Sequence, residues 1–266
     1  MNEYPELGRV ISAFPTSFKN LFFNQLNHLI NYSPTIGLMG KTGAGKSSLI
    51  NALFQSQLSP VSDVSGVGES LERDKEYHQL YRSLLPELDL IIWVLKSDDR
   101  AWSSDEQCYR FLTEQCGCQP NRFLFVLNQA DKIEPCRQWD EQCHQPSPEQ
   151  VANLELKQQA VITAFKPHHP VMTVSAVENY QLTELAEQLI QVLPAEASSG
   201  VARQLNNTYR TQSVEDSARN DFGQCVSDIV DTLIDILPLP VLIKSTIGTV
   251  KNSIVFVAKS LWSLFF

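Results

Sequence analysis

The octapeptide Gly40-Lys41-Thr42-Gly43-Ala44-Gly45-Lys46-Ser47 lies between a short apolar run and a segment of helical character. It satisfies G-x-x-x-x-G-K-[ST] at every fixed position, and the run before it, Thr35 to Met39, has the composition of a strand. A loop that binds a phosphate chain must point backbone N–H groups at it, and glycines let the backbone wrap closely without Cβ clashes. The motif therefore predicts a phosphate-binding loop between a strand and a helix.

Each polar residue of this loop has a predicted role. Lys46 would reach the terminal phosphates of a nucleotide, and Ser47 would ligate magnesium. The helix that begins here adds the positive end of its dipole. The candidate nucleotide-binding residues are Gly40, Lys41, Thr42, Gly43, Ala44, Gly45, Lys46, Ser47 and Ser48, with Mg²⁺ as the expected cofactor.

Apolar runs and helical segments alternate after the loop. The runs are Leu88 to Leu95, Arg122 to Leu127 and Val171 to Val174. This alternation is typical of an α/β fold with a doubly wound, mostly parallel sheet. The helices between the strands are predicted at Gly45 to Gln55, Glu69 to Leu84, Ser104 to Gln115, Pro148 to Phe165 and Leu182 to Leu193.

A second motif, Asn128-Gln129-Ala130-Asp131, indicates which base would be bound. It follows directly on a predicted strand, and loops at the carboxyl ends of parallel strands bind ligands. A carboxylate at Asp131 can accept hydrogen bonds from both guanine N1–H and the exocyclic amine, whereas adenine offers an acceptor at N1. GTP or GDP is therefore the expected ligand, and an adenine nucleotide is the alternative.

These motifs resemble those of the Era-like, translation-factor-related class of bacterial GTPases, especially the predicted GTPases carried by genomic islands and prophages. The resemblance rests on Gly40 to Ser48, on Asn128 to Asp131 as N-[KQ]-x-D, and on Ser175-Ala176 after the last predicted strand. It implies that Ser175 and Ala176 place a backbone N–H near the guanine oxygen. Gln129 stands where Lys is commoner, which suggests weaker binding.

The segment between Ser48 and Leu88 departs from that family. The family normally inserts there a switch loop with a magnesium-binding Thr, two strands and a D-x-P-G turn. This chain has no Thr from Leu49 to Leu112, and the nine residues 56–64 reach roughly 30 Å at full extension, enough for one strand. One or two edge strands are therefore predicted to be missing. Asp63 begins a D-x-x-G spelling: either it holds the metal at a shortened strand, or the spelling is accidental.

This shortening bears on catalysis, because the switch Thr and the D-x-x-G turn ordinarily position water and charge around the γ-phosphate. We expect guanine-nucleotide binding with weak or absent GTP hydrolysis. Two alternatives remain: a slow but functional GTPase switch, and a partner- or membrane-docking module with a vestigial phosphate loop. The uncovered sheet edge also predicts self-association.

The flanks of the chain are predicted to be helical. Residues 1–34 would contain an amphipathic helix over Pro15 to Ile30, residues 35–195 the nucleotide-binding domain, and residues 201–266 a helical hairpin after the linker Pro194 to Gly200. Residues 236–266 carry three Lys and no acidic residue and end on aromatic residues. Membrane-surface or protein contact through this segment competes with plain packing, and its Lys and Ser residues argue against a bilayer span.

Composition limits the remaining classes. With 266 residues, a net charge of -9 and a pI near 5.1, the chain is unlike a general nucleic-acid binder. The first eight residues include Glu3 and Glu6 and no apolar core, so we expect a cytoplasmic protein with free thiols. A zinc site is the minor alternative, with Cys116, Cys118, Cys136, Cys143 and His144 as its ligands.

Overall fold

The computed structural model describes residues 5–54 and 83–266. Two compact units share the chain, and each is described by itself. The α/β unit comprises residues 35–193 and 204–211, and the helical unit combines residues up to 34 with 194–203 and 212–266. The predicted strand over 56–64, the helix over 69–84 and Asp63 lie outside the described residues, apart from the last two residues of that helix.

A four-stranded parallel sheet forms the centre of the α/β unit, in the order β1-β2-β3-β4. The parallel α/β fold predicted from the alternating pattern is confirmed. Within the described part of the chain β1 pairs only with β2, so β1 forms one edge. The strands are β1 Ile36–Met39, β2 Leu90–Lys96, β3 Phe123–Asn128 and β4 Met172–Thr173.

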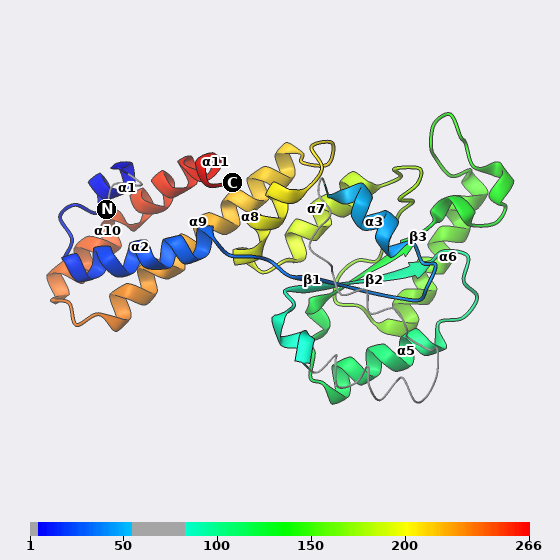
Figure 1. Cartoon of the computed structure of the whole chain (residues 1–266), viewed down its shortest axis with the longest axis horizontal. Coiled ribbons are helices and arrows are strands. Elements are labelled where there is room, and N and C mark those ends of the chain that lie inside the picture. Colours follow the sequence, from blue (N-terminus) through cyan, green and yellow to red (C-terminus); the bar gives the residue numbers. More distant parts are fainter. Residues whose placement is uncertain (1–4, 55–82) are drawn as a thin grey trace. The chain divides into compact units, whose positions relative to one another are not determined.

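Helices cover both faces of this sheet. Figure 1 shows α3 and α7 above the strands and α5 below them. The helices are α3 Lys46–Leu53, α5 Ser103–Arg110, α6 Pro148–Phe165 and α7 Leu182–Val192, and α5 runs on into the π-helical turn η2 Phe111–Gln115. Short 3₁₀ turns are η1 Leu85–Glu87, η3 Pro120–Arg122, η4 Ala130–Lys132 and η5 Cys136–Gln138.

The central strands are apolar throughout because both of their faces are covered. Successive side chains of a strand point to opposite faces, so Ile91, Trp93 and Leu95 share one face of β2. They join Phe123 and Phe125 of β3 in a buried aromatic cluster. The other members of this core come largely from α5, η2 and α6: Tyr109, Phe111, Leu112, Val161 and Phe165.

The helical unit is assembled from both ends of the chain. In Figure 1 the blue helices α1 and α2 lie with the orange and red helices α10 and α11, next to α9. Apolar stripes at helical spacing bring these helices together, which confirms the predicted amphipathic helix and terminal hairpin. The elements are α1 Pro5–Val10, α2 Thr16–Ile30, α8 Ala195–Gln204, α9 Gln212–Ile236, α10 Val241–Ser260 and α11 Trp262–Phe265.

The interpretation of Pro194 to Gly200 as a linker is wrong, because helix α8 begins directly after Pro194, at Ala195. Their small side chains are buried, and they permit close packing where a loop was expected. The Ser199 hydroxyl donates to the carbonyl of Ala218 and accepts a hydrogen bond from Trp262 Nε1 at 2.9 Å. Small-residue composition therefore indicated a helix–helix contact here and not flexibility.

The aromatic end of the chain packs inside the helical unit. Trp262 is 1% exposed, and Phe265 and Phe266 lie against the ring of Phe222 in α9. The sequence analysis left open whether these residues contact a membrane or another protein or pack within the protein. A membrane or a second protein is not needed to bury Trp262, because α8 and α9 supply its neighbours.

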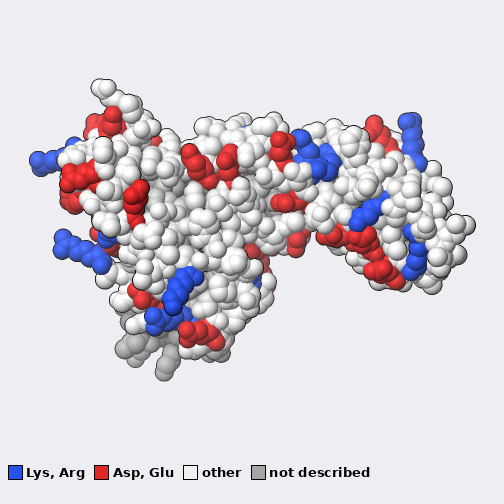
Figure 2. Space-filling model, turned by 180° about the vertical axis from the view of Figure 1, so that it is seen from behind, with Lys and Arg blue, Asp and Glu red and all other residues white. Residues whose placement is uncertain are grey.

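Charged side chains of both signs are interspersed on the face drawn in Figure 2. Among the described residues in that view, Lys and Arg are scattered and separated by uncharged surface. An acidic chain with dispersed cations on this face offers no long basic track there.

Two glycines of the helical unit allow a matched test of α8 packing. A Cβ at Gly200 would lie 2.9 Å from Cδ of Pro34, whereas a Cβ at exposed Gly248 of α10 would meet nothing within 4 Å. We expect Gly248→Ala to stabilise the fold by about 0.5–1 kcal/mol through helix propensity. Gly200→Ala should give none of this gain or a net loss, as measured by equilibrium chemical denaturation. Equal stabilisation of both variants would contradict close packing at α8.

Candidate functional site

The predicted site residues gather at one edge of the sheet. Gly40 directly follows β1, Asn128 is the last residue of β3, and Ser175 comes two residues after β4. All these strands are parallel, so their carboxyl ends open on the same side. Ligands of open α/β sheets bind on that side.

At two positions of the phosphate loop only glycine fits, because neighbouring atoms lie too close for a Cβ. Gly40, Gly43 and Gly45 all have positive φ, at 130°, 81° and 83°. A Cβ at Gly40 would lie 2.1 Å from the carbonyl oxygen of Val94, and one at Gly45 would lie 2.4 Å from Nδ2 of Asn128. Gly45 also begins α3 without a capping side chain, so the first N–H groups of that helix face the loop.

Lys46 places its ammonium inside the loop. Its Nζ donates to the carbonyl oxygens of Gly40 at 2.9 Å and Lys41 at 3.2 Å, and the residue is 6% exposed. Ser47 and Ser48, in the first turn of α3, are exposed. A fixed positive charge at a helix N-terminus, beside exposed hydroxyls, is an environment that favours an anion such as phosphate.

The side chain of Asn128 joins two loops. Its Nδ2 donates to the carbonyl oxygens of Ala44 at 2.9 Å and Gly45 at 3.3 Å, and its Oδ1 accepts from the backbone N–H of Ala176 at 3.2 Å. The backbone carbonyl of Asn128 accepts from the N–H and hydroxyl of Ser97. With 1% exposure, this residue satisfies its polar groups within the protein.

The neighbours of Asn128 add a second set of contacts. Gln129, in the left-handed conformation, donates from Nε2 to the carbonyl oxygen of Gly43 at 2.8 Å. The buried hydroxyl of Ser175 donates to Oδ1 of half-buried Asp131 at 2.6 Å, which orients that carboxylate. The phosphate loop, Asp131 and the Ser175-Ala176 turn therefore form one connected structure.

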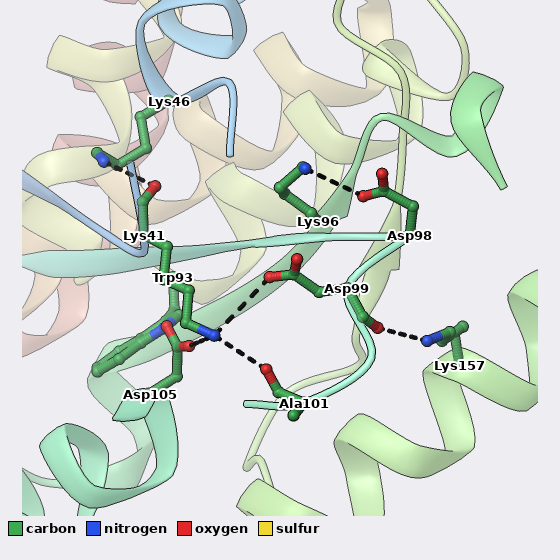
Figure 3. Close-up of polar contacts among 9 residues, drawn as sticks. All are labelled: Lys41, Lys46, Trp93, Lys96, Asp98, Asp99, Ala101, Asp105 and Lys157. Carbon is green, nitrogen blue, oxygen red and sulfur yellow. Dashed lines mark hydrogen bonds and ion pairs between the residues drawn. The ribbon is translucent and has the colours of Figure 1, made fainter. Parts of the chain in front are cut away.

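Below the loop lies a charge pair between a half-buried lysine and a fully buried carboxylate that the sequence did not indicate. Figure 3 shows Lys41 directed at Asp105 and Ala101, away from Lys46. Its Nζ lies 3.2 Å from Oδ2 of Asp105 and donates to the carbonyl oxygen of Ala101 at 2.9 Å. Asp105 is fully buried, and its Oδ1 accepts a hydrogen bond from Trp93 Nε1 at 3.1 Å. The second residue of the loop is thus tied to β2 and to the start of α5.

Some site residues carried a sequence signal and others did not. Lys41 was proposed as part of the loop, but its side chain contacts protein groups and not the loop's interior. Asp105 has the position of an ordinary first-turn acid of α5, and nothing in its neighbourhood marks its partner 64 residues away. Gln129 was considered only as a replacement for Lys, whereas its amide holds Gly43.

The cysteines form no metal centre in the described part of the chain. All six are free, and no group of three or more His, Cys, Asp or Glu side chains gathers there. Burial raises the pKa of the Cys118 thiol, and burial with nearby acids raises the pKa of Cys225 to about 11. Both thiols therefore ionise less readily than an ordinary cysteine.

The Lys41–Asp105 pair predicts a stability difference between two lysines. Lys41→Met leaves the buried Asp105 carboxylate without its cation, and one-sided removal from a buried pair costs about 3–5 kcal/mol. Because the Lys41 side chain is 31% exposed, we expect about 2–3 kcal/mol of lost unfolding free energy in chemical denaturation. The matched control is Lys96→Met, whose pair with Asp98 at 3.3 Å is partly exposed and should contribute less than about 1 kcal/mol.

A second variant tests whether the loss comes from the stranded charge. In Lys41→Met/Asp105→Asn the neutral amide still offers an oxygen to Trp93, so part of the lost stability should return. Equal losses for Lys41→Met and Lys96→Met, or no recovery in the double variant, would rule out this account of the pair.

Comparison with known proteins places the chain among relatives. The family described as 50S ribosome-binding GTPase matches residues 35–80, which include the phosphate loop. The Escherichia coli protein YfjP is 40% identical and covers 98% of this chain and 97% of its own length. Escherichia coli YkfA is 38% identical, with 96% of each chain covered. The tRNA modification GTPase MnmE of Bacteroides thetaiotaomicron is 25% identical, covering 48% of this chain and 31% of MnmE.

The relatives and the loop geometry agree. YfjP and YkfA match nearly the whole chain, and the GTPase family match begins at β1 and runs through the loop whose glycines and lysine are described above. The chain therefore belongs to the family of YfjP and YkfA, and its residues 35–80 match the family described as 50S ribosome-binding GTPase.

Proposed function

We propose that this protein binds GTP and GDP at the carboxyl edge of the sheet, with weak or absent GTP hydrolysis. The observation that carries the proposal is the bonding of Asn128 to Ala44, Gly45 and Ala176, which holds a phosphate-binding segment and a base-binding segment in one rigid site. Preorganised loops lose little conformational entropy when a ligand binds.

The phosphates would lie over the loop Gly40–Ser47. The positive-φ glycines turn backbone N–H groups toward the loop's interior, and Lys46 supplies a fixed cation there. The N-terminus of α3 adds its partial positive charge. Together these groups suit a chain of phosphates whichever base is attached.

Base choice would rest on Asp131. A carboxylate accepts hydrogen bonds only, so it matches the two adjacent donors of guanine and meets an acceptor in adenine. The Ser175 hydroxyl fixes one carboxylate oxygen at 2.6 Å, which sets the plane in which the carboxylate can receive the base. The neighbouring N–H of Ala176 is bonded to Asn128, so this turn contributes position more than a free donor.

Magnesium fits the oxygen donors of this site. Mg²⁺ prefers a few protein oxygens completed by phosphate oxygens and water, and the exposed Ser47 hydroxyl in the first turn of α3 is such a donor. When bound, the ion would neutralise charge on the phosphates. Asp63, the other candidate ligand, lies outside the described residues.

Weak or absent hydrolysis is proposed from the sequence between α3 and β2. No Thr occurs from Leu49 to Leu112, although GTPases of the resembled class use a switch Thr there. The match to YfjP extends over 284 aligned positions against 266 residues in this chain, so at least 18 positions of YfjP have no counterpart here. A shortened switch segment is consistent with both facts.

Asp131→Asn tests the proposed ligand. The amide of the variant presents a donor where the carboxylate accepted. The binding preference should therefore move from GDP toward xanthosine diphosphate (XDP) by at least about tenfold. Calorimetric titration of the parent and the variant with GDP, XDP and ADP in the presence of Mg²⁺ measures this change. Lys46→Ala is the phosphate-side control and should abolish binding of every nucleotide.

The same titrations can reject the proposal. A parent chain that binds ADP as tightly as GDP, or an Asp131→Asn variant with unchanged preference, removes the guanine assignment. Equal binding by Lys46→Ala and the parent removes the phosphate loop from the site.

The shortened segment predicts a turnover defect. We expect GTP hydrolysis by the purified chain to stay close to the uncatalysed background with Mg²⁺, and the chain to self-associate through the edge strand β1. A chimera that receives the switch-and-hairpin segment of an intact GTPase of the resembled class between Val64 and Ser65 should hydrolyse GTP faster and elute as a smaller species. Single-turnover phosphate release and light scattering measure the two properties, and rapid turnover by an unmodified monomer would contradict the proposal.

A further inference from the structure

Eight successive apolar residues join α9 to α10 and include the adjoining ends of both helices. They are Ile236-Leu237-Pro238-Leu239-Pro240-Val241-Leu242-Ile243, here called the hairpin tip. Val241 and Leu242 are 84% and 79% exposed, the highest values among the large hydrophobic side chains that the structure describes. Ile236 on the opposite arm is 64% exposed. Loops between helices normally carry polar residues, so such a tip calls for a partner.

The backbone of the hairpin tip needs little water. Pro238 and Pro240 have no N–H group. The N–H groups of Leu237, Leu239 and Ile243 are bonded to carbonyl oxygens of residues 233, 237 and 240. Unbonded backbone donors are what exclude turns from apolar surroundings, because each costs several kcal/mol there. Most donors of this tip are already satisfied or absent.

Helix α10 continues the tip with a composition that suits lipid. Val241–Ser260 is long and apolar enough to cross a membrane by length and composition alone. The mean hydropathy of its most apolar 18-residue stretch is 1.3, and 17% of that stretch is buried. Core helices of soluble proteins also have this length and composition, so the prediction that Lys and Ser argue against a bilayer span stays a prediction. Lys251 is ion-paired with Asp231, and Ile254 and Ala258 are buried, so the far half of α10 is held on α9.

Lys244 stands at the border between the tip and the rest of α10. Its ammonium has no ion-pair or hydrogen-bond partner among the described residues, and its long stem can run beside apolar groups while the ammonium reaches a phosphate. Asp235 borders the other arm, so the two flanking charges cancel. Burial of aliphatic side chains would therefore dominate over attraction to anionic lipid.

We propose that the hairpin tip inserts into the interfacial layer of a lipid bilayer, with residues 236–243 at the acyl boundary and Lys244 at the headgroups. Eight successive residues without a polar side chain match an acyl layer, whereas protein interfaces place polar residues around their apolar centre. The tip docks without α10 spanning the bilayer, because the other end of α10 stays packed on α9. The proposal is independent of nucleotide binding.

Vesicle co-sedimentation of the full chain tests it. The variant Val241→Asp/Leu242→Asp changes two side chains that are 84% and 79% exposed, so its fold should be retained. We expect the fraction bound to phosphatidylcholine vesicles to fall by about tenfold or more in this variant, with phosphatidylglycerol adding little. The matched control is Leu156→Asp in α6, which removes an equally apolar side chain that is 68% exposed, and it should bind vesicles like the parent.

Three vesicle results, and one result without lipid, would each overturn the proposal. The proposal is wrong if the parent chain fails to bind vesicles, or if the tip variant binds as well as the parent. It is also wrong if Leu156→Asp loses as much binding as the tip variant. Light scattering without lipid identifies a competing occupant. If the parent is a dimer and Val241→Asp/Leu242→Asp is a monomer, a second copy of the chain covers the tip and the lipid assignment is wrong.

Discussion

The carboxamide of Asn128 is the contact on which the site depends. An amide has both donors and an acceptor, so one side chain can hold carbonyls of the phosphate loop on one side and the N–H of Ala176 on the other. These partners lie 84 and 48 residues away along the chain. Because Asn128 is the last residue of a central strand and is buried, its position is fixed by the sheet, and both loops take their positions from it.

The phosphate loop is held from two directions. Lys46 bonds carbonyls of the loop itself, whereas Lys41 reaches below it to the buried Asp105. A buried charge pair adds little net stability, but it is costly to break, so it restricts the loop to one arrangement. Trp93 of β2 completes this support by donating to the same carboxylate. The aromatic core of the sheet is therefore linked to the phosphate loop through Trp93, Asp105 and Lys41.

The helical unit uses its apolar residues in two ways. Small residues of α8 let Trp262 and the neighbouring helices approach closely, and this buries the aromatic end of the chain. The aliphatic residues of the hairpin tip instead remain exposed on a backbone whose donors are largely satisfied. Apolar residues are therefore buried at the aromatic end of the chain, where α8 and α9 lie close enough to cover them. They stay exposed at the hairpin tip, where the described residues leave them uncovered.

The sequence by itself determined the parallel α/β fold, the phosphate loop and the positions of most helices that the structure describes, because glycine spacing and apolar periodicity are local properties of the chain. It also placed Asn128 and Asp131 at a strand end. Only the tertiary structure decided that Lys41 pairs with Asp105, that Gln129 clamps Gly43, and that residues 194–200 form a helix. Those outcomes depend on which side chains meet across long stretches of chain. A charged or small residue has the same local pattern whether it faces water or a buried partner.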